Sequence, residues 1–364
     1  MNPPLRPRNE RPVMPKSIEP PIFSVILPVH NGGTYVRACI KSVLEQRVTA
    51  FRLDILENSS TDGTREYVEG LSDSRVSIWP SQKKLSIEEN WQRILQIPRS
   101  EYMTIIGHDD LLDPSFLEVI LSLIHDHPDA SLYQTHFQLI DSTGKLLRHC
   151  TPIPSMEKAH EFLAARLCQM RDSFGTGYVV RSRDYDEVGG IPPYHKLLFA
   201  DEALWYMITR KSYKVASPQV CTSYRLHSGG MTGGANPSDY VLALRHYLGL
   251  LESLPPDADT KRVLKNYLAG YVRYYVPNGL THALALDDTL FSSVCESAQA
   301  IYASPLADLS ADDVKRTLIL KSHAFLRGFW KSARFLIQIL KSCLPYSLVL
   351  LIQKRLAKSL SRRL

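Results

Sequence analysis

Residues 23–33 read FSVILPVHNGG, a short apolar run rich in β-branched residues that ends in a polar turn with two glycines. Apolar residues at helical spacing follow from Tyr35 to Glu45. This order predicts a strand, a turn and a helix. Residues 51–56 (FRLDIL) predict a second strand, and the polar turn ENSSTDGT joins it to a helix from about residue 64 to residue 71.

The same alternation continues along the chain. A third short strand is predicted at residues 76–79, a helix at 87–95 and a fourth strand at 102–106. Strands and helices that alternate at this spacing are typical of an α/β domain with a mostly parallel sheet. Such sheets bind ligands outside the carboxyl ends of their strands. We therefore expect the turns HNGG, ENSSTDGT and HDD to converge on one crevice.

The last of these turns carries adjacent carboxylates. Residues 105–114 read IIGHDDLLDP, and no Lys or Arg lies within seven residues of Asp109 or Asp110 on either side. Two neighbouring anions repel, so a structural role would normally pair them with cations. The alternative is a loop in which Asp110 or Asp113 caps a helix over residues 114–126, with Pro114 at its first position. The stretch alone leaves both interpretations open.

The second half of the chain mixes strands and helices and then becomes helical. Strands are predicted at residues 130–140 and 146–149, joined by the turn DSTGK, and again at 213–220 and 221–226. Helices are predicted at 157–170 and from about Asp201, and a loop and strand between them at 173–182. The glycine-rich loop HSGGMTGG at 227–234 precedes a helical region at 238–313.

Composition indicates a globular protein with a basic C-terminal end. The 364 residues are 44% hydrophobic, which is ample for a buried core. Residues 314–364 carry twelve Lys or Arg and no Asp or Glu, whereas the preceding 313 residues carry 31 basic and 37 acidic side chains. A basic end on an acidic body argues against a nucleic-acid-binding protein.

The cysteines and the N-terminus indicate a cytoplasmic setting. Six scattered cysteines form no CxxC pair, which disfavours zinc and a disulfide framework. Residues 1–21 are rich in Pro and Arg and lack a continuous apolar segment, so we expect a flexible leader rather than a signal peptide or a membrane span. These features favour a reducing compartment.

Five elements in order resemble one family. PVHNGG, ENSSTDGT, GHDD, a GG…AD…W segment and YRLHSGGMT, over roughly residues 23–234, are similar to the family 2 glycosyltransferases with the GT-A fold. The resemblance implies a Rossmann-like nucleotide-sugar-binding domain with a mostly parallel central sheet, at residues 22–237, followed by a helical region. It also implies inverting transfer of a sugar from a nucleotide-activated donor, most often a UDP-sugar, to an acceptor hydroxyl.

The resemblance assigns roles to particular residues. A divalent cation, Mg²⁺ or Mn²⁺, would be anchored by Asp109 and His227, because hard oxygen ligands suit these ions and the cation neutralises the diphosphate leaving group. Asp201 matches the carboxylate that acts as general base on the acceptor hydroxyl. The remaining implied contacts are, for the donor nucleotide, Pro28, Val29, His30, Asn31, Glu57, Asn58, Lys84 and Asp110, and, for the donor or acceptor sugar, Gly175, Thr176 and Glu202.

Three positions depart from the family pattern, and three other residues of these motifs have a structural alternative to the functional role. Gly107 stands where the family often has another Asp, Ala200 precedes Asp201 where Glu is more common, and Glu57 replaces a shorter Asp that binds the pyrimidine ring. Asp201 could instead be a helix N-cap, and Asp62 could stabilise its own turn. His227 could be an ordinary loop histidine.

The basic end of the chain predicts contact with a membrane surface. Residues 314–364 contain amphipathic patterns with one cationic face and no apolar stretch of the roughly 20 residues that cross a bilayer. Basic amphipathic helices lie in the interface of anionic membranes, although such a face can also pack on its own protein. We expect a protein on the inner face of the membrane, which acts on a glycan or a lipid-linked acceptor in polysaccharide assembly.

Two other functions compete with this interpretation. A catalytically inactive relative could bind a nucleotide or act as a scaffold, and its support is the glycine at position 107. A nucleotidyltransferase would also use an α/β sheet and a carboxylate-bound metal. It would be expected to carry basic residues in a glycine-rich turn after the first strand, and HNGG has no Lys or Arg.

Overall fold

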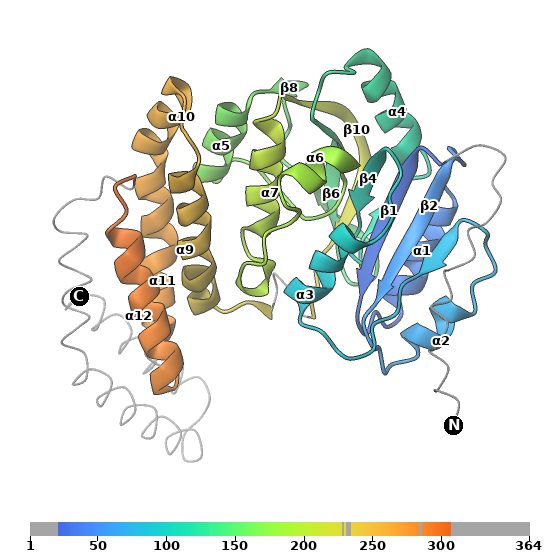
Figure 1. Cartoon of the computed structure of the whole chain (residues 1–364), viewed down its shortest axis with the longest axis horizontal. Coiled ribbons are helices and arrows are strands. Elements are labelled where there is room, and N and C mark those ends of the chain that lie inside the picture. The colour runs from blue at the N-terminus through green and yellow to red at the C-terminus, as the bar shows by residue number, and fades with distance from the viewer. Residues whose placement is uncertain (1–20, 228, 231–233, 284–285, 307–364) are drawn as a thin grey trace, which may run out of the picture. The chain divides into compact units, whose positions relative to one another are not determined.

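The computed structural model describes residues 21–227, 229–230, 234–283 and 286–306. They form two compact units. The sheet unit contains the described residues up to 162, residues 171–193 and those from 200 to 230. The helical unit contains residues 163–170, 194–199 and the described residues from 234 onward (Figure 1). The predicted leader falls outside the described residues except for residue 21, and the predicted basic helices of residues 314–364 lie wholly outside them.

The sheet unit is built on one twisted sheet, in which the described residues form ten strands in the order β3-β2-β1-β4-β9-β6-β10-β5, with β7 beside β6 and β8 beside β10. β1 runs parallel to β2 and β4, and β6 runs parallel to β10, whereas β9 is antiparallel to both of its neighbours. The strands are β1 (Phe23–Val29), β2 (Phe51–Glu57), β3 (Val76–Ile78), β4 (Tyr102–Ile105), β5 (Leu111–Leu112), β6 (Leu132–Ile140), β7 (Leu146–His149), β8 (Met156–Glu157), β9 (Tyr178–Arg181) and β10 (Lys214–Arg225).

Helices cover this sheet because their apolar stripes are buried against it. β1 and β2 are buried along their whole length, and Val36 and Ile40 of α1 and Ile120 of α4 belong to the same apolar cluster as these strands. α3 begins with a capping box between Ser86 and Glu89. The helices are α1 (Tyr35–Leu44), α2 (Thr64–Glu69), α3 (Ile87–Gln92) with the 3₁₀ turn Arg93–Gln96, α4 (Phe116–Asp126), α5 (Ala159–Leu167), α6 (Ser182–Glu187) and α7 (Ala200–Thr209).

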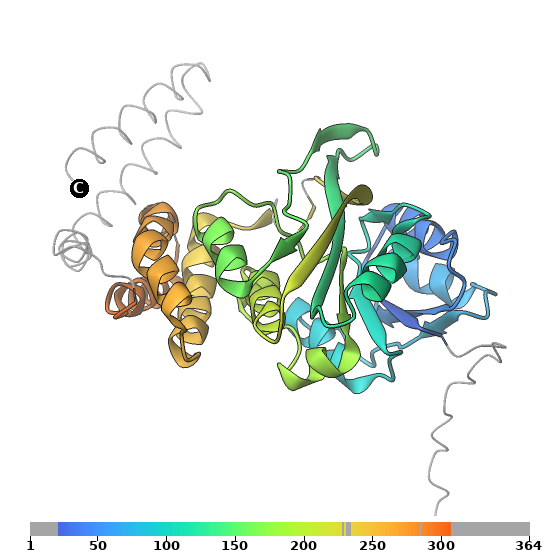
Figure 2. The ribbon, with the colours of Figure 1, turned by 90° about the horizontal axis from the view of Figure 1, so that it is seen from above.

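The helical unit consists mainly of α9, α11 and α12, which lie side by side in both views (Figures 1 and 2). Its elements are the 3₁₀ turn His195–Leu197, α9 (Pro237–Ser253), α10 (Ala258–Val263), the π-helical turn Leu264–Leu268, α11 (Ala269–Ala283) and α12 (Asp288–Tyr302). α9 starts with a capping box between Asn236 and Asp239. Within the described residues, no helix combines the length and the hydropathy that a membrane span requires.

The α/β fold with a mainly parallel sheet and C-terminal helices confirms the class predicted from the sequence. Several boundaries differ. The predicted strands at 213–220 and 221–226 form one strand, β10, whose pairing with β6 shifts register near Val220. Glu157 belongs to β8, so α5 begins two residues later than expected. The five described cysteines are free thiols, in agreement with the prediction.

The capping interpretation of the HDD stretch fails for Asp110, whereas Asp113 caps the turn that leads into α4. α4 begins at Phe116 rather than at Pro114, and its N-cap residue Ser115 makes no side-chain capping bond. Asp113 Oδ1 instead accepts hydrogen bonds from the amide and hydroxyl of Ser115 before the helix starts. Asp110 points elsewhere, because its Oδ1 accepts a hydrogen bond from the amide of Arg225 at 3.0 Å.

Candidate functional site

The HDD turn follows β4 directly and places Asp109 against His227. The amide of Asp110 donates to the carbonyl of Gly107 at 3.1 Å and closes the turn. Asp109 Oδ2 lies 2.8 Å from His227 Nε2. The side chain of Asp109 is 19% exposed and that of His227 is 14% exposed, so a ligand can reach both. The structure therefore brings together the two residues that the resemblance assigns to the metal, although 118 positions separate them.

Asp110 lies beneath this turn. The residue is 2% exposed, and burial together with the charge of Asp109 raises the pKa of Asp110 well above its usual range. The Arg225 amide and the Thr176 hydroxyl oppose this shift. Such burial favours support of the turn over direct contact with a ribose, and the predicted role of Asp110 in nucleotide binding stays a prediction.

The loops after β1 and β2 are cross-linked at the same edge of the sheet. The Asn31 amide donates to Ser60 Oγ at 3.0 Å, and the Thr61 amide donates to Asn31 Oδ1 at 2.8 Å. The Gly33 amide donates to Asp62 Oδ2 at 2.8 Å. Desolvation raises the pKa of Asp62, but hydrogen bonds from Thr64 and Gly33 outweigh it and lower that pKa. Asp62 therefore stabilises its turn, as the sequence predicted, and the two loops form one fixed surface.

Asn31 adopts a positive φ of 52° in this surface, a conformation that Asn tolerates better than most side chains. Its neighbour His30 lies 2.7 Å from the Asn58 carbonyl through Nδ1. A carbonyl only accepts, so Nδ1 carries the proton in this contact. Pro28 and Val29 are buried in β1, and the Val29 carbonyl accepts the Asn58 amide at 2.9 Å. These bonds within the protein do not test the predicted contacts of Pro28 and Val29 with the nucleotide, which stay predictions.

Glu57 ends β2 and is fully buried. Its Oε1 accepts a hydrogen bond from the Ser60 amide at 2.6 Å. Its Oε2 has no hydrogen-bond partner within the described part of the chain. A buried carboxylate oxygen without a donor is costly. This oxygen is consequently the best candidate in the loop for a contact with a base N–H, as the resemblance implies.

Asn58 and Lys84, the other two predicted nucleotide contacts in this region, differ in their surroundings. The Asn58 side chain accepts the Leu85 amide at 2.8 Å and donates to the Leu85 carbonyl at 3.0 Å, so it fixes the loop after β3. Lys84 in that loop is exposed. Both predicted nucleotide contacts remain predictions, and the role that the structure gives Asn58 is to hold the neighbouring loop.

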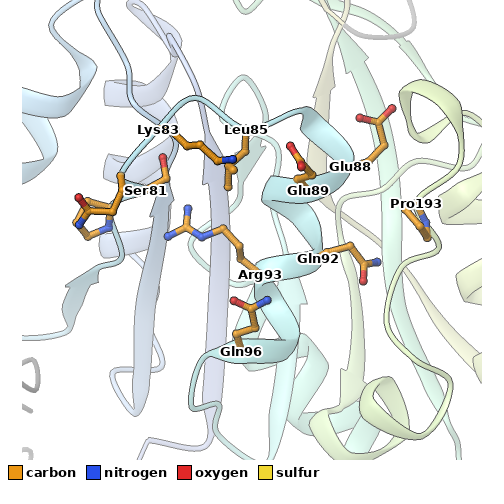
Figure 3. Close-up of a pocket in the computed structure, with 11 residues that line it drawn as sticks. Ser81, Lys83, Leu85, Glu88, Glu89, Gln92, Arg93, Gln96 and Pro193 are labelled. Atoms are coloured by element: carbon orange, nitrogen blue, oxygen red, sulfur yellow. The ribbon is translucent and has the colours of Figure 1, made fainter. Parts of the chain in front are cut away.

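A pocket opens beside this loop (Figure 3). It has a volume of ≈ 530 Å³ and lies between the loop after β3 and α3. Arg93 lines it and donates to the Glu57 carbonyl at 3.2 Å and to the Trp79 carbonyl at 2.5 Å. This guanidinium therefore joins the carboxyl ends of β2 and β3 next to the Glu57 carboxylate. The other lining residues are Pro80, Ser81, Gln82, Lys83, Leu85, Glu88, Glu89, Gln92, Gln96 and Pro193.

Asp201 lies in the first turn of α7 and is partly exposed. Its Oδ1 accepts a hydrogen bond from the amide of Glu202 at 2.8 Å, and Glu202 itself is 1% exposed. Four residues further along α7, the Trp205 indole donates to the Phe174 carbonyl at 2.9 Å. This bond holds the loop that begins at Phe174 against the start of α7.

That loop connects the two groups of carboxylates. A Cβ on Gly175 would lie 3.3 Å from the Trp91 ring and 3.9 Å from Asp201 Cβ. The next residue, Thr176, is 2% exposed and lies close enough to Asp110 to lower the pKa of that carboxyl, although its hydroxyl has no hydrogen-bond partner within the described residues. Asp201 and the HDD turn therefore each lie close to one of two consecutive residues, both of which the resemblance had placed near the sugar.

The donor set suits a divalent cation bound together with a substrate. Within the described residues, no cluster of three or more His, Cys, Asp or Glu side chains could hold a metal by itself. Asp109 and His227 offer one oxygen and one nitrogen ligand. Mg²⁺ and related ions commonly take one or two protein ligands and complete their shell with phosphate and water. The residues thus fit a cation that arrives with a diphosphate.

Sequence reasoning did not identify Arg225, Tyr35 or Trp91 as parts of this site. Arg225 contacts the HDD turn, and the Tyr35 ring contacts the His227 ring. The Trp91 ring lies beside Gly175. Their side chains reach the site from β10, α1 and α3. Only the absence of a nearby cation for Asp109 and Asp110 hinted that a distant Arg or Lys would be needed.

Comparison with known proteins identifies the class of fold. The mannosyltransferase PcManGT from Pyrobaculum calidifontis, in complex with GDP-Man and Mn²⁺, superposes with a TM-score of 0.51 at 13% identity, covering 90% of this chain and 91% of that one. The structure of S. aureus TarS 1-349 in complex with UDP-GlcNAc gives a TM-score of 0.58 at 15% identity, covering 77% and 81%. The sheet unit therefore has the GT-A fold.

Sequence similarity gives the family. The sequence model described as Glycosyl transferase family 2 matches residues 24–187. The glycosyltransferase GlyG of Streptococcus pneumoniae is 20% identical over 132 residues, which cover 36% of this chain and 44% of the length of GlyG. Residues 24–187 thus match the family 2 glycosyltransferases, and the prediction made from the motifs is confirmed.

Proposed function

We propose that this chain transfers a sugar from a nucleoside diphosphate sugar to an acceptor hydroxyl with inversion at the anomeric carbon. The observation that carries the proposal is the arrangement around Gly175 and Thr176. Asp201 lies close to Gly175, and Thr176 lies close to Asp110, the neighbour of Asp109 in the turn that contacts His227. A donor sugar bound beside this dipeptide would have a candidate base and a candidate leaving-group site near it, and inverting displacement needs both.

Asp201 is the general base of this proposal. An acceptor hydroxyl has a pKa far above 7, so its attack on the anomeric carbon needs a group that takes its proton. Asp201 is partly exposed at the start of α7, whereas the adjacent Glu202 is buried. The accessible carboxylate is therefore the one that can reach an incoming hydroxyl.

Asp109 and His227 receive the diphosphate end. A cation held by this pair would neutralise the charge that develops on the leaving diphosphate. The fixed surface of the loops after β1 and β2 orients the nucleoside. The His30 ring is fixed there, because its Nδ1 proton is donated to the Asn58 carbonyl.

The hydrogen-bond acceptors of the Glu57 carboxylate favour uridine diphosphate as the nucleotide. The Ser60 amide already donates to Oε1, which leaves Oε2 as the carboxylate oxygen without a donor within the described residues. The imide of uracil offers one N–H donor, whereas guanine presents two neighbouring donors that need both oxygens. TarS binds UDP-GlcNAc and PcManGT binds GDP-Man, so both kinds of nucleotide occur on this fold. The single acceptor supports the first.

We place the acceptor on a lipid carrier at the inner membrane surface. The support is the sequence of residues 314–364, with twelve basic and no acidic side chains, which would be attracted to anionic lipids. Deletion of the residues after Asp313 is expected to move the protein from the membrane pellet to the supernatant. An unchanged pellet fraction would contradict the membrane assignment and leave the transfer chemistry standing.

The transfer chemistry is tested by Asp201→Asn. The variant should bind UDP as the wild type does and lose turnover by about 10²-fold or more, since a positioned base contributes 10²–10⁴. Asp259→Asn, also in the first turn of a helix, is the matched control and should keep full activity. Retained turnover in Asp201→Asn together with loss in Glu202→Gln would transfer the base role to Glu202.

A further inference from the structure

Arg225 supplies the cation that the sequence around the HDD turn lacks. It is the last residue of β10, 115 positions beyond Asp110, and only 5% of its surface is exposed. Its amide donates to Asp110 Oδ1 at 3.0 Å, and its Nε donates to the main-chain carbonyl of Asp109 at 2.8 Å. Arg225 thus holds Asp110 through its main-chain amide and Asp109 through its side chain, and the Nε bond goes to the main-chain carbonyl of Asp109 rather than to its carboxylate.

The pairing of β5 with β10 brings this arginine to the turn. Leu112 pairs with Thr222 and Leu111 with Ser223 in an antiparallel register. The same register, continued by two residues, brings Arg225 opposite Asp109. The contact is therefore set by the register of the sheet.

The far side of the guanidinium is fixed as firmly. Nη1 donates to the carbonyls of Asp141 and Ser142, at 3.1 and 3.4 Å, in the turn between β6 and β7. The guanidinium carbon lies 4.8 Å from the centre of the Tyr35 ring, a cation–π distance. The same ring lies 4.9 Å from the His227 ring. Tyr35 therefore links the arginine to the histidine that faces Asp109.

We propose that Arg225, with Tyr35 beneath it, is a positioning residue that holds the Asp109 carboxylate and the His227 ring in the geometry that receives a metal-bound diphosphate. This inference rests on the proposed function. Arg225 fixes the main chain of Asp109 and leaves the carboxylate for a ligand, while its charge offsets the repulsion between two adjacent anions. A flexible or neutral residue at position 225 would release the turn.

The test compares Arg225→Gln with wild type and with Arg75→Gln. Arg75 is the matched control, because it also donates to a main-chain carbonyl, that of Leu44, and lies 4.6 Å from a ring centre, that of Phe51, away from the site. Mn²⁺ affinity is measured calorimetrically with UDP present, and uridine affinity is measured without metal. Arg225→Gln should weaken Mn²⁺ binding by about 10–100-fold, the usual effect of removing a group that orients a ligand, and change uridine binding less than about twofold.

Further variants keep the result interpretable. Arg75→Gln should lose stability and keep wild-type Mn²⁺ affinity. Arg225→Lys, which keeps the charge but not the fork of donors, should recover only part of the affinity. If Arg225→Gln does not fold, Tyr35→Leu takes its place, since Tyr35 is only partly buried and its replacement leaves every hydrogen bond of Arg225 intact.

Two outcomes separate the inference from the function beneath it. Folded Arg225→Gln or Tyr35→Leu with wild-type Mn²⁺ affinity would overturn the positioning role while leaving the glycosyltransferase assignment intact. Wild-type protein that binds neither UDP nor Mn²⁺ would overturn the proposed function, and the role of Arg225 with it.

Discussion

Gly107 is the position where the structure and the family pattern lead to opposite predictions. Relatives often carry an Asp there, so restoring Asp would be expected to improve the diphosphate site. In this structure, a Cβ at position 107 would lie 2.9 Å from Asp109 Oδ1 and 2.9 Å from Asp110 Oδ2. The carboxylates of the neighbouring residues occupy the space of the missing side chain.

The magnitude follows from what holds these oxygens in place. Each carboxylate would have to retreat by about 0.5 Å to restore an ordinary contact. Neither is free to move, since Asp110 accepts from the Arg225 amide at 3.0 Å and Asp109 is 2.8 Å from His227. Loss of one charge-assisted hydrogen bond costs about 1.5–3 kcal/mol. Gly107→Ala should therefore lose stability of this order, and because it displaces the Asp109 carboxylate it should also weaken Mn²⁺ binding in the presence of UDP by about tenfold or more.

Gly107→Asp should be worse than Gly107→Ala, because it adds a third anion to the same turn. Calorimetry of Mn²⁺ binding with UDP, with thermal unfolding to verify the fold, measures both variants. Gly249→Ala is the control, since Gly249 is exposed on α9 with open space around it. It should gain about 0.5–1 kcal/mol of stability. Binding by Gly107→Asp as tight as that of wild type would refute this reasoning.

Two further predictions concern stability. The hydrogen bond from Arg148, 2.6 Å away, lowers the pKa of Asp172 to about 2. The carboxylate therefore stabilises the fold fully above about pH 4, and this contribution disappears as the pH falls through 2. Because Arg148 is half exposed, solvent screens this ion pair. We expect Asp172→Asn to lower the free energy of unfolding by about 1 kcal/mol at pH 7 and by almost nothing at pH 2. Urea unfolding at both pH values measures this, and a loss that does not change with pH would contradict it. In the helical unit, a Cβ on Gly279 would lie 2.2 Å from Val241. Gly279→Ala should therefore lower the free energy of unfolding by about 1–3 kcal/mol. An unchanged urea midpoint would show that α9 and α11 do not pack this closely.

Much of the fold could be predicted from the sequence because its signals are local. The apolar runs that became β1, β2 and β4 alternate with helical patterns, and each run ends in a polar turn. These patterns depend on neighbouring residues only, so they survive without knowledge of the tertiary structure. The errors occurred where pairing partners decide the element. Glu157 joined a strand because β8 pairs with β10, and the shift near Val220 left one strand where two were expected.

The candidate site was predictable in part for the same reason. Asp109, Asp201 and His227 stand in motifs that can be recognised in order along the chain. The buried state of Asp110 and the unpartnered oxygen of Glu57 could not be inferred, because the solvent exposure of a side chain depends on every element packed around it.

The sequence by itself determined the α/β class, the polar turns at the carboxyl ends of the strands, and the family. It also posed a question that it could not answer, which was how two adjacent carboxylates persist without a cation nearby. Tertiary structure answered it with Arg225, which the pairing of β5 and β10 brings to the turn from 115 residues away. Neutralisation acts through space over a few ångströms, and only the register of the sheet decides which distant residue stands at that distance.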